Sequence, residues 1–244
     1  GDETVIRGLY TSAAGMVAQQ VRLDVAANNL ANAATPGYRA DVASTAALPS
    51  LFLYRFNDAM GQIPPFATGS PPVGYLGTGA AVAQVTTLER GGFYRETGRE
   101  LDFALQGEGF FVVATPAGER YTRSGAFQVN AAGELVTSEG FSVLTRSGGV
   151  ARADDPDLAG SLAVVAAPAG QPLTKVGNNL FTAPAALLPA DTPVLRGVLE
   201  EANISPVEAM VDLITAMRTY EAGQKAIQTQ DQTLDKLINE VGRV

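Results

Sequence analysis

Residues 205–241 read SPVEAMVDLITAMRTYEAGQKAIQTQDQTLDKLINEV and carry the strongest helix signals in the chain. Ser205 is a favourable N-cap, Pro206 suits the first helical position, and Glu208 completes a capping box with the serine. One row of residues recurs every seven positions: Leu213, Tyr220, Ile227, Leu234 and Val241. A second row begins three residues earlier: Met210, Met217, Gln224, Asp231 and Ile238. Two such rows form a heptad seam, which predicts a long helix that packs against another helix.

A second long helix is predicted near the other end of the chain, over about residues 6–33. Its seam advances alternately by four and three residues: Leu9, Ala13, Met16, Gln20, Leu23, Ala27 and Leu30. Such spacing is typical of helices that pack in a coiled coil. Pro36-Gly37 ends this helix, because proline biases the preceding residue away from helix and glycine favours a turn.

Polar residues interrupt both predicted seams at Gln20, Gln224 and Asp231. Buried polar residues set the register between helices in some coiled coils. The same residues are equally compatible with the exposed edge of an amphipathic helix. The sequence leaves these two interpretations open.

The region between the helices changes character twice. Residues 36–80 show no sustained period and contain Pro64-Pro65 and Pro71-Pro72, which suggests an extended connector. From there to residue 195, short apolar runs alternate with turn residues about every ten positions, which favours an antiparallel β domain. The expected fold class is therefore α+β, with terminal helices forming a coiled-coil-like assembly element around a central β domain. The expected divisions are 1–35, 36–80, 81–195 and 196–244.

The composition restricts the chemistry of the chain. Its 244 residues carry a net charge of −8 and include neither His nor Cys. A Ser-His-Asp triad, a thiol nucleophile and an ordinary structural zinc site are therefore excluded, and we expect no catalytic residue, metal or cofactor. Nucleic acid is not expected as a partner, because phosphate binding requires a concentrated basic surface. No apolar stretch reaches the ~20 residues of a membrane span, and no cleaved signal peptide is recognisable.

Three motifs resemble those of the bacterial flagellar basal-body rod and hook proteins. They are RGLYTSAAGMVAQQ at 7–20 leading into ANNLANAATPGYR at 27–39, LDFALQGEGFF at 101–111 with YTRSGAFQVNAAGELV at 121–136, and GVLEEANISPVEAMVDLITAMRTYEAGQKAIQTQDQTL at 197–234. The resemblance implies a non-enzymatic subunit of the rod that self-assembles through its terminal helices and transmits torque for motility. It also implies copies of the chain and other rod or hook subunits as partners. Export by the flagellar type III apparatus, without a cleaved signal peptide, is implied as well.

Within that family, the length favours the rod over the hook, and the motifs leave proximal and distal rod paralogues open. The expected assembly residues are the seam positions and the asparagines near the end of the first helix. They are Leu9, Met16, Leu23, Asn28, Asn29, Leu30, Asn32, Met210, Leu213, Met217, Tyr220, Ile227, Leu234 and Ile238. The asparagines have a second interpretation, as the polar face of a helix near its end.

Two other functions compete with this interpretation. A cell-wall hydrolase would need two convergent carboxylates, and no motif locates such a pair. A secreted surface filament or adhesin subunit would use the same helices but would not account for the three motifs. The acidic group Asp154, Asp155 and Asp157 lacks the remaining ligands of a calcium loop and is interpreted as a solvated turn.

Overall fold

A computed structural model of the chain describes residues 2–54, 72–168 and 173–241. They divide into two compact units. The first, here called the helix-and-arm unit, comprises Gly1–Asn28, Asp41–Thr86 and Ala209–Val244. The second, called the β unit, comprises Asn29–Ala40 and Thr87–Glu208.

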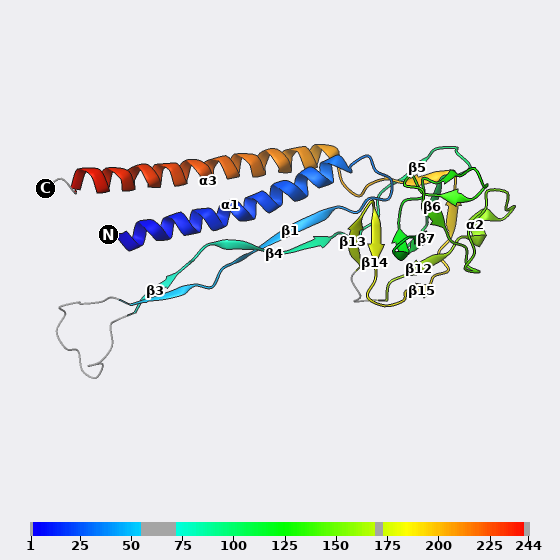
Figure 1. The fold of residues 1–244 in the computed structure, drawn as a ribbon, viewed down its shortest axis with the longest axis horizontal. Helices are drawn as coiled ribbons and strands as arrows, with labels where there is room; N and C mark the ends of the chain where they lie inside the picture. Colours follow the sequence, from blue (N-terminus) through cyan, green and yellow to red (C-terminus); the bar gives the residue numbers. More distant parts are fainter. Residues whose placement is uncertain (1, 55–71, 169–172, 242–244) are drawn as a thin grey trace, which may run out of the picture. The chain divides into compact units, whose positions relative to one another are not determined.

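Both terminal helices are confirmed: α1 spans Asp2–Ala31 and α3 spans Pro206–Val241 (Figure 1). The predicted start of α3 is also confirmed, because the amide of Glu208 donates to the Ser205 hydroxyl over 3.4 Å. In the described part of the chain, no helix is both long and apolar enough to cross a membrane.

Two glycines mark where α1 and α3 approach each other. A Cβ placed on Gly8 would lie 2.8 Å from Nε2 of Gln230, and one on Gly223 would lie 2.8 Å from Cγ of Met16. The residue numbers of these paired positions increase along α1 and decrease along α3, so the two helices are antiparallel (Figure 1). The other side of α1 meets the arm, because a Cβ on Gly79 would lie 3.5 Å from Cβ of Ala14.

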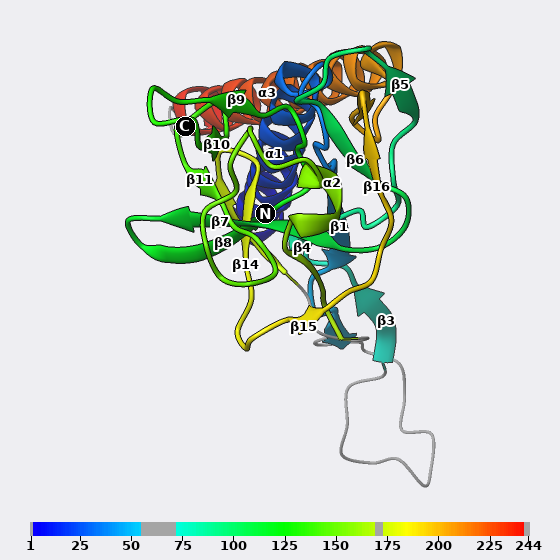
Figure 2. The ribbon, with the colours of Figure 1, turned by 90° about the vertical axis from the view of Figure 1, so that its right-hand side faces the viewer.

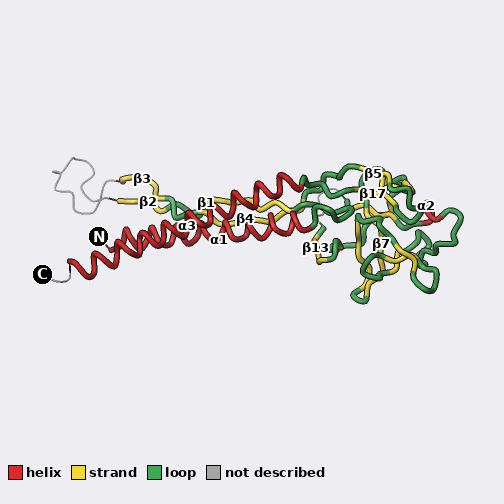
Figure 3. The backbone as a smooth tube through the Cα atoms, turned by 90° about the horizontal axis from the view of Figure 1, so that it is seen from above, coloured by secondary structure: helices red, strands yellow, loops and turns green. Residues whose placement is uncertain are grey.

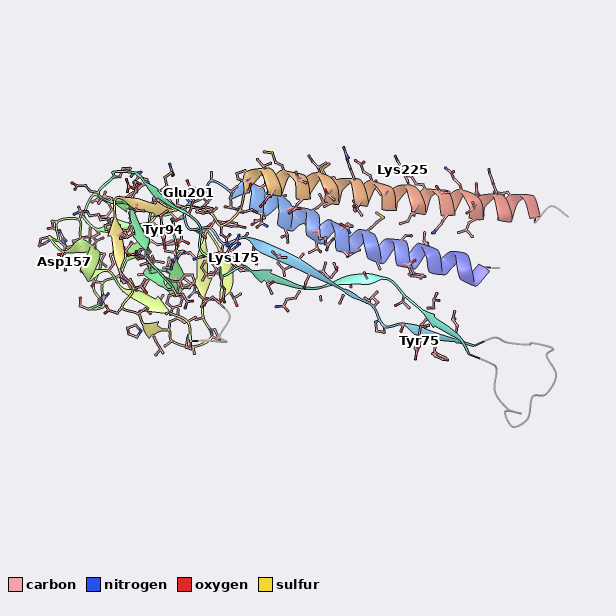
Figure 4. All side chains as sticks on the ribbon, turned by 180° about the vertical axis from the view of Figure 1, so that it is seen from behind. Tyr75, Tyr94, Asp157, Lys175, Glu201 and Lys225 are labelled. Atoms are coloured by element: carbon pink, nitrogen blue, oxygen red, sulfur yellow. The ribbon has the colours of Figure 1, made fainter. Side chains whose placement is uncertain are left out.

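Three strands of the arm lie within residues 36–80, for which the sequence shows no period, and the fourth extends into the segment predicted as part of the β domain. The arm consists of β1 (Asp41–Ala47), paired with β4 (Ala80–Thr87), and β2 (Leu51–Tyr54), paired antiparallel with β3 (Pro72–Leu76). The apolar run at 51–54 is thus a strand. Phe52 stacks edge-on against Tyr75 across the pair, with ring centroids 4.8 Å apart (Figure 4 labels Tyr75). Both faces of a two-stranded ribbon are accessible, so no alternation of polar and apolar residues marks it.

The β unit is built from short strands linked by long loops (Figures 2 and 3). They are β5 (Tyr94–Glu96), β6 (Phe103–Leu105), β7 (Phe110–Thr115), β8 (Gly118–Thr122), β9 (Gln128–Val129), β10 (Leu135–Val136), β11 (Ser142–Val143), β12 (Val164–Ala166), β13 (Thr174–Gly177), β14 (Leu180–Thr182), β15 (Leu188–Pro189), β16 (Val194–Arg196) and β17 (Val198–Glu200), with the short helix α2 (Leu158–Ser161). Nine of them form a sheet of order β13-β14-β8-β7-β11-β10-β9, with β12 joining β7 to β15. The strand pairs of this sheet are antiparallel, which confirms the α+β class and the central antiparallel domain.

An apolar core closes one face of this sheet. Its largest fully buried side chains include Phe103, Phe111 and Phe127, and Phe111 meets Phe127 edge-on with centroids 5.3 Å apart. Strands β7, β10, β11 and β14 and helix α2 supply Val113, Leu135, Val143, Leu180 and Leu158 to the same cluster. Among the described residues, every member of this cluster lies between residues 101 and 194, as the strand-like runs of the sequence predict.

We therefore expect a fragment of residues 36–204, without the two terminal helices, to fold by itself. Its core is retained whole, so thermal unfolding followed by circular dichroism should be a single cooperative transition. A broad, non-cooperative transition would contradict this expectation and would mean that the helices complete the core.

Candidate assembly surfaces

The covered face of α3 is a seam of large and small residues. The row Leu213, Tyr220, Ile227 and Leu234 is half-buried, as the heptad pattern predicts. The row between these positions is Ala209, Ala216, Gly223 and Gln230, whose members are buried or half-buried. Small side chains in this second row allow α1 to approach closely, as the contact between Met16 and Gly223 shows.

The second row that the sequence suggested lies outside this seam. Met210 and Met217 are 51% and 47% exposed, and Gln224 and Asp231 are exposed as well. The side chain of Ile238 lies outside the described residues. Heptad counting thus found one of the two rows of the covered face and missed the other, because alanine and glycine carry no strong apolar signal.

Helix α1 likewise has one covered face and one exposed face. Leu9, Met16, Leu23 and Leu30 are half-buried, whereas Ala13, Gln20 and Ala27 are exposed. Large apolar side chains also face solvent here, with Tyr10 70% and Val17 63% exposed. Gln20, Gln224 and Asp231 thus lie on exposed faces within one chain, which favours the second interpretation of these residues.

The three asparagines have different surroundings. Asn29 is buried, and its side-chain oxygen accepts a hydrogen bond of 3.0 Å from the Tyr38 hydroxyl. Asn32 holds the following turn, since its side-chain oxygen accepts from the Thr35 hydroxyl over 3.3 Å. Asn28 is exposed. Asn29 and Asn32 therefore shape the end of the helix within the β unit.

A buried charge cluster, which we call the Arg–Glu–Arg cluster, lies in the β unit. Its members are Arg39, Arg123 and Glu200, each less than a tenth exposed. Oε2 of Glu200 accepts from Nε of Arg123, and Oε1 lies 3.0 Å from Nη2 of Arg39. The amide of Gly92 adds a hydrogen bond of 3.1 Å to Oε1. The Glu200 carboxylate is thereby held by two cations and one backbone donor.

The two arginines differ in how many of their N–H groups have a hydrogen-bond acceptor. Arg123 donates its remaining hydrogen bonds to the carbonyls of Gly109, Leu105 and Gly107, which fixes the loop between β6 and β7. Nε and Nη1 of Arg39 have no hydrogen-bond acceptor among the described residues. Burial lowers the pKa of the Arg39 guanidinium below its usual value, and the Glu200 carboxylate opposes this shift. The Arg39 guanidinium stays charged, because an arginine pKa is far above neutral.

The turn after α1, which reads TPGYR at residues 35–39, packs against the Arg–Glu–Arg cluster. Gly37 adopts a φ of 66°, and its amide donates to the Glu200 carbonyl over 2.7 Å. A Cβ at this position would lie 2.5 Å from the carbonyl carbon of Arg123, so only glycine fits. The Asn203 side chain accepts from the Ala40 amide over 2.7 Å. These bonds join the segment after α1 to the segment that precedes α3.

Strands β13 and β14 hold the same turn from another direction. The Lys175 ammonium lies 4.1 Å from the centre of the Tyr38 ring and donates to the carbonyl of Arg39. The Asn179 side chain donates to the Pro36 carbonyl over 3.0 Å. Figure 4 labels Lys175 in the β unit. The TPGYR turn is therefore held in place by hydrogen bonds and a cation–π contact from the β13–β14 region.

Sequence reasoning did not single out Arg39, Arg123 or Glu200. Each lies in one of the three quoted motifs, but periodicity cannot reveal an ion pair between residues 77 or more positions apart. The acidic group at 154–157 is not part of any such cluster: Asp154 pairs with Arg152 over 3.2 Å, and the Asp157 amide donates to Asp155 over 3.0 Å.

Three protein families match successive parts of the chain. They are described as "Flagella basal body rod protein" at residues 9–39, "Flagellar hook protein FlgE/F/G D1 domain" at 104–175, and "Flagellar basal body rod FlgEFG protein C-terminal" at 195–240. Each matched segment contributes one member of the Arg–Glu–Arg cluster. The chain is 34% identical to the flagellar basal-body rod protein FlgG of Agrobacterium fabrum, over 93% of this chain and 96% of the relative. The chain belongs to the flagellar basal-body rod protein family.

Two further relatives extend the comparison. The FlgG protein of Borreliella burgdorferi is 32% identical over 94% of this chain and 97% of its own length. That of Bacillus subtilis is 29% identical over 96% and 99%. The chain is accordingly a structural rod subunit of the flagellar basal body and belongs to a non-enzymatic family. The hydrolase and adhesin alternatives are not favoured.

Proposed function

We propose that this rod subunit self-assembles through α1 and α3, and that the resulting shaft transmits torque for motility. Membership of the family already implies assembly with other rod and hook subunits. The finer proposal names copies of this chain as partners and the helices as the element that joins them. It is supported chiefly by the exposed apolar residues of α3, Met210, Val211, Ile214 and Met217. Contiguous exposed apolar surface of this kind marks interaction sites in soluble proteins.

The seam positions divide into two roles in this proposal. Leu9, Met16, Leu23 and Leu30 on α1, with Leu213, Tyr220, Ile227 and Leu234 on α3, stabilise the helix pair within one subunit. Met210 and Met217 contact a neighbour. Asn28, at the exposed surface, and Ile238 remain proposed partner contacts, whereas Asn29 and Asn32 act through the turn that they stabilise.

The β unit contributes stiffness. Residues Asn29–Ala31 of α1 and Pro206–Glu208 of α3 belong to the β unit, and the Arg–Glu–Arg cluster lies between the segments that continue from them. The segments that continue from the two helices are therefore held to each other within the β unit. We further propose the divisions 1–35, 36–80, 81–195 and 196–244 as assembly helix, connector, β domain and assembly helix.

The route to the rod is proposed from family membership. Export through the flagellar type III apparatus, without a cleaved signal peptide, would deliver the subunit to the growing end of the shaft. No cofactor or metal enters this function, since its mechanism is packing.

Met217→Asp tests the assembly role of the helices. Met217 is half-exposed in the single chain, so the variant should fold, but an aspartate buried against a neighbour costs several kcal/mol. Repeated in every subunit, this cost should lower incorporation into basal bodies at least tenfold and abolish motility. Immunoblotting of purified basal bodies measures the incorporation, and secreted protein is measured separately to exclude an export defect. Leu23 is half-buried, so Leu23→Asp would mix folding with assembly and is the less sharp test.

Thr219→Asp is the matched control. It adds the same charge to the same helix, two residues away, at an exposed position off the apolar face. It should leave incorporation and motility near wild-type levels, since exposed substitutions usually change stability by less than ~0.5 kcal/mol. Exported Met217→Asp subunits that build working flagella would overturn the assembly role of this helix face.

A further inference from the structure

Each terminal helix leaves one apolar face uncovered within a single chain. On α3 the uncovered face within the helix-and-arm unit includes Met210, Val211, Ile214 and Met217, and we call these four residues the α3 face. On α1 it consists of Tyr10, Ala13 and Val17, called the α1 face. The members of the α1 face follow one another by steps of three and four residues, and on the α3 face Ile214 lies three or four residues from each of the others, so each face can pack against another helix.

The two faces lie at different levels along the helix pair. Gly8 lies opposite Gln230 and Met16 opposite Gly223, so paired positions on the two helices have numbers that total about 239. Ile214, at the middle of the α3 face, is therefore level with about residue 25 of α1. Ala13, at the middle of the α1 face, lies about twelve residues away from that level, or about 18 Å at 1.5 Å per residue. The faces of one chain cannot meet each other.

We propose that the α3 face of one copy packs on the α1 face of the next copy, with the copies offset by about 18 Å along the helix axis. The inference rests on the proposed self-assembly through the helices and specifies its geometry. Copies offset along the axis in the same orientation keep these two helices antiparallel. In that arrangement Val17 meets Met210, Ala13 meets Ile214, and Tyr10 meets Met217.

The chemistry of the two faces fits this pairing. The small Ala13 faces the large Ile214, and a tyrosine ring beside a methionine sulfur is a favourable contact. Residues 8–21 of α1 contain no charged side chain, so Asp212 and Arg218, which flank the α3 face, meet no like charge. A second copy of the chain is therefore the partner that is complementary to both faces.

The area that this contact buries determines how strongly two copies bind each other. Half-exposed to mostly exposed side chains of this kind bury on the order of 100 Å² each, so the seven bury roughly 700 Å² in total. A stable interface needs at least about 1,000 Å². One pair of copies should therefore separate readily in solution. A pairing that joins different faces leaves each copy with a face still open, so it propagates as a helical array and does not close.

Single-cysteine variants test the offset directly, because the chain contains no Cys of its own. A13C and I214C, carrying different epitope tags, are co-expressed in the motile bacterium and oxidised in purified basal bodies. Ala27 is the matched control: it is an exposed alanine on the same face of α1, two heptads from Ala13. It is level with the α3 face, so A27C would pair with I214C if copies packed without an offset.

The proposal expects A13C and I214C to form a mixed disulfide at least tenfold more efficiently than A27C and I214C. A yield for A27C that equals or exceeds that of A13C overturns the offset. Incorporation of both variants without the A13C–I214C product also overturns it, and leaves self-assembly standing. Failure of the wild-type chain itself to enter basal bodies overturns both proposals.

Discussion

Glu200→Gln is expected to destabilise the β unit by about 3–5 kcal/mol, because it leaves two buried guanidinium groups without a counter-charge. Glu200 is 2% exposed and bonded to Arg39, Arg123 and the Gly92 amide. For a chain of this length each kcal/mol lowers the melting temperature by about 2–4 °C, so we expect a fall of roughly 10 °C. Thermal and urea unfolding of the purified chain, followed by circular dichroism, measure both quantities.

The neighbouring residue supplies the control. Glu201 pairs with Arg95 over 3.0 Å, but both side chains are about half exposed. Exposed ion pairs stabilise proteins by about 0–1 kcal/mol, so Glu201→Gln should change the melting temperature by no more than a few degrees. Equal effects of the two substitutions would show that the Arg–Glu–Arg cluster does not stabilise the fold.

Gly37→Ala is expected to have an effect of similar size for a steric reason. Its φ of 66° already disfavours a side chain, and the new Cβ would lie 2.5 Å from the Arg123 backbone. Backbone cannot move aside as a flexible side chain can, so the turn must leave its position and lose its bonds to Glu200 and Asn203. We expect a loss of at least about 3 kcal/mol in the free energy of unfolding, measured by urea titration.

Gly98→Ala separates backbone strain from the clash. Gly98 has nearly the same φ, 69°, but a Cβ on it would meet no atom of the described residues within 4 Å, its chain neighbours aside. Only the cost of the left-handed conformation, about 1–2 kcal/mol, applies there. If both alanine variants lose the same stability, the close packing of the TPGYR turn on Arg123 is not what requires glycine at position 37.

A destabilised β unit should also affect the rod. Since we propose that the β unit stiffens the shaft, loosening the Arg–Glu–Arg cluster should reduce torque transmission before it prevents subunit incorporation. This order of effects is the reverse of that for Met217→Asp, which should block incorporation while leaving the β unit intact. The two classes of variant therefore distinguish stiffness from assembly.

The sequence by itself determined the two helices, their N-cap at Ser205 and the stop at Pro36-Gly37, because these depend on local capping and backbone preferences. It determined the β core for the same reason, since alternating apolar runs and turns are local signals. The motifs also identified the family. The tertiary structure alone decided which second row completes the covered face of α3, because alanine and glycine in that row pack closely without an apolar signal. It alone revealed the strands of the arm, whose two accessible faces impose no periodic pattern. The Arg–Glu–Arg cluster likewise needed the fold, because a buried ion pair depends on the distance between residues in space, and charges at 39, 123 and 200 become neighbours only when three segments converge.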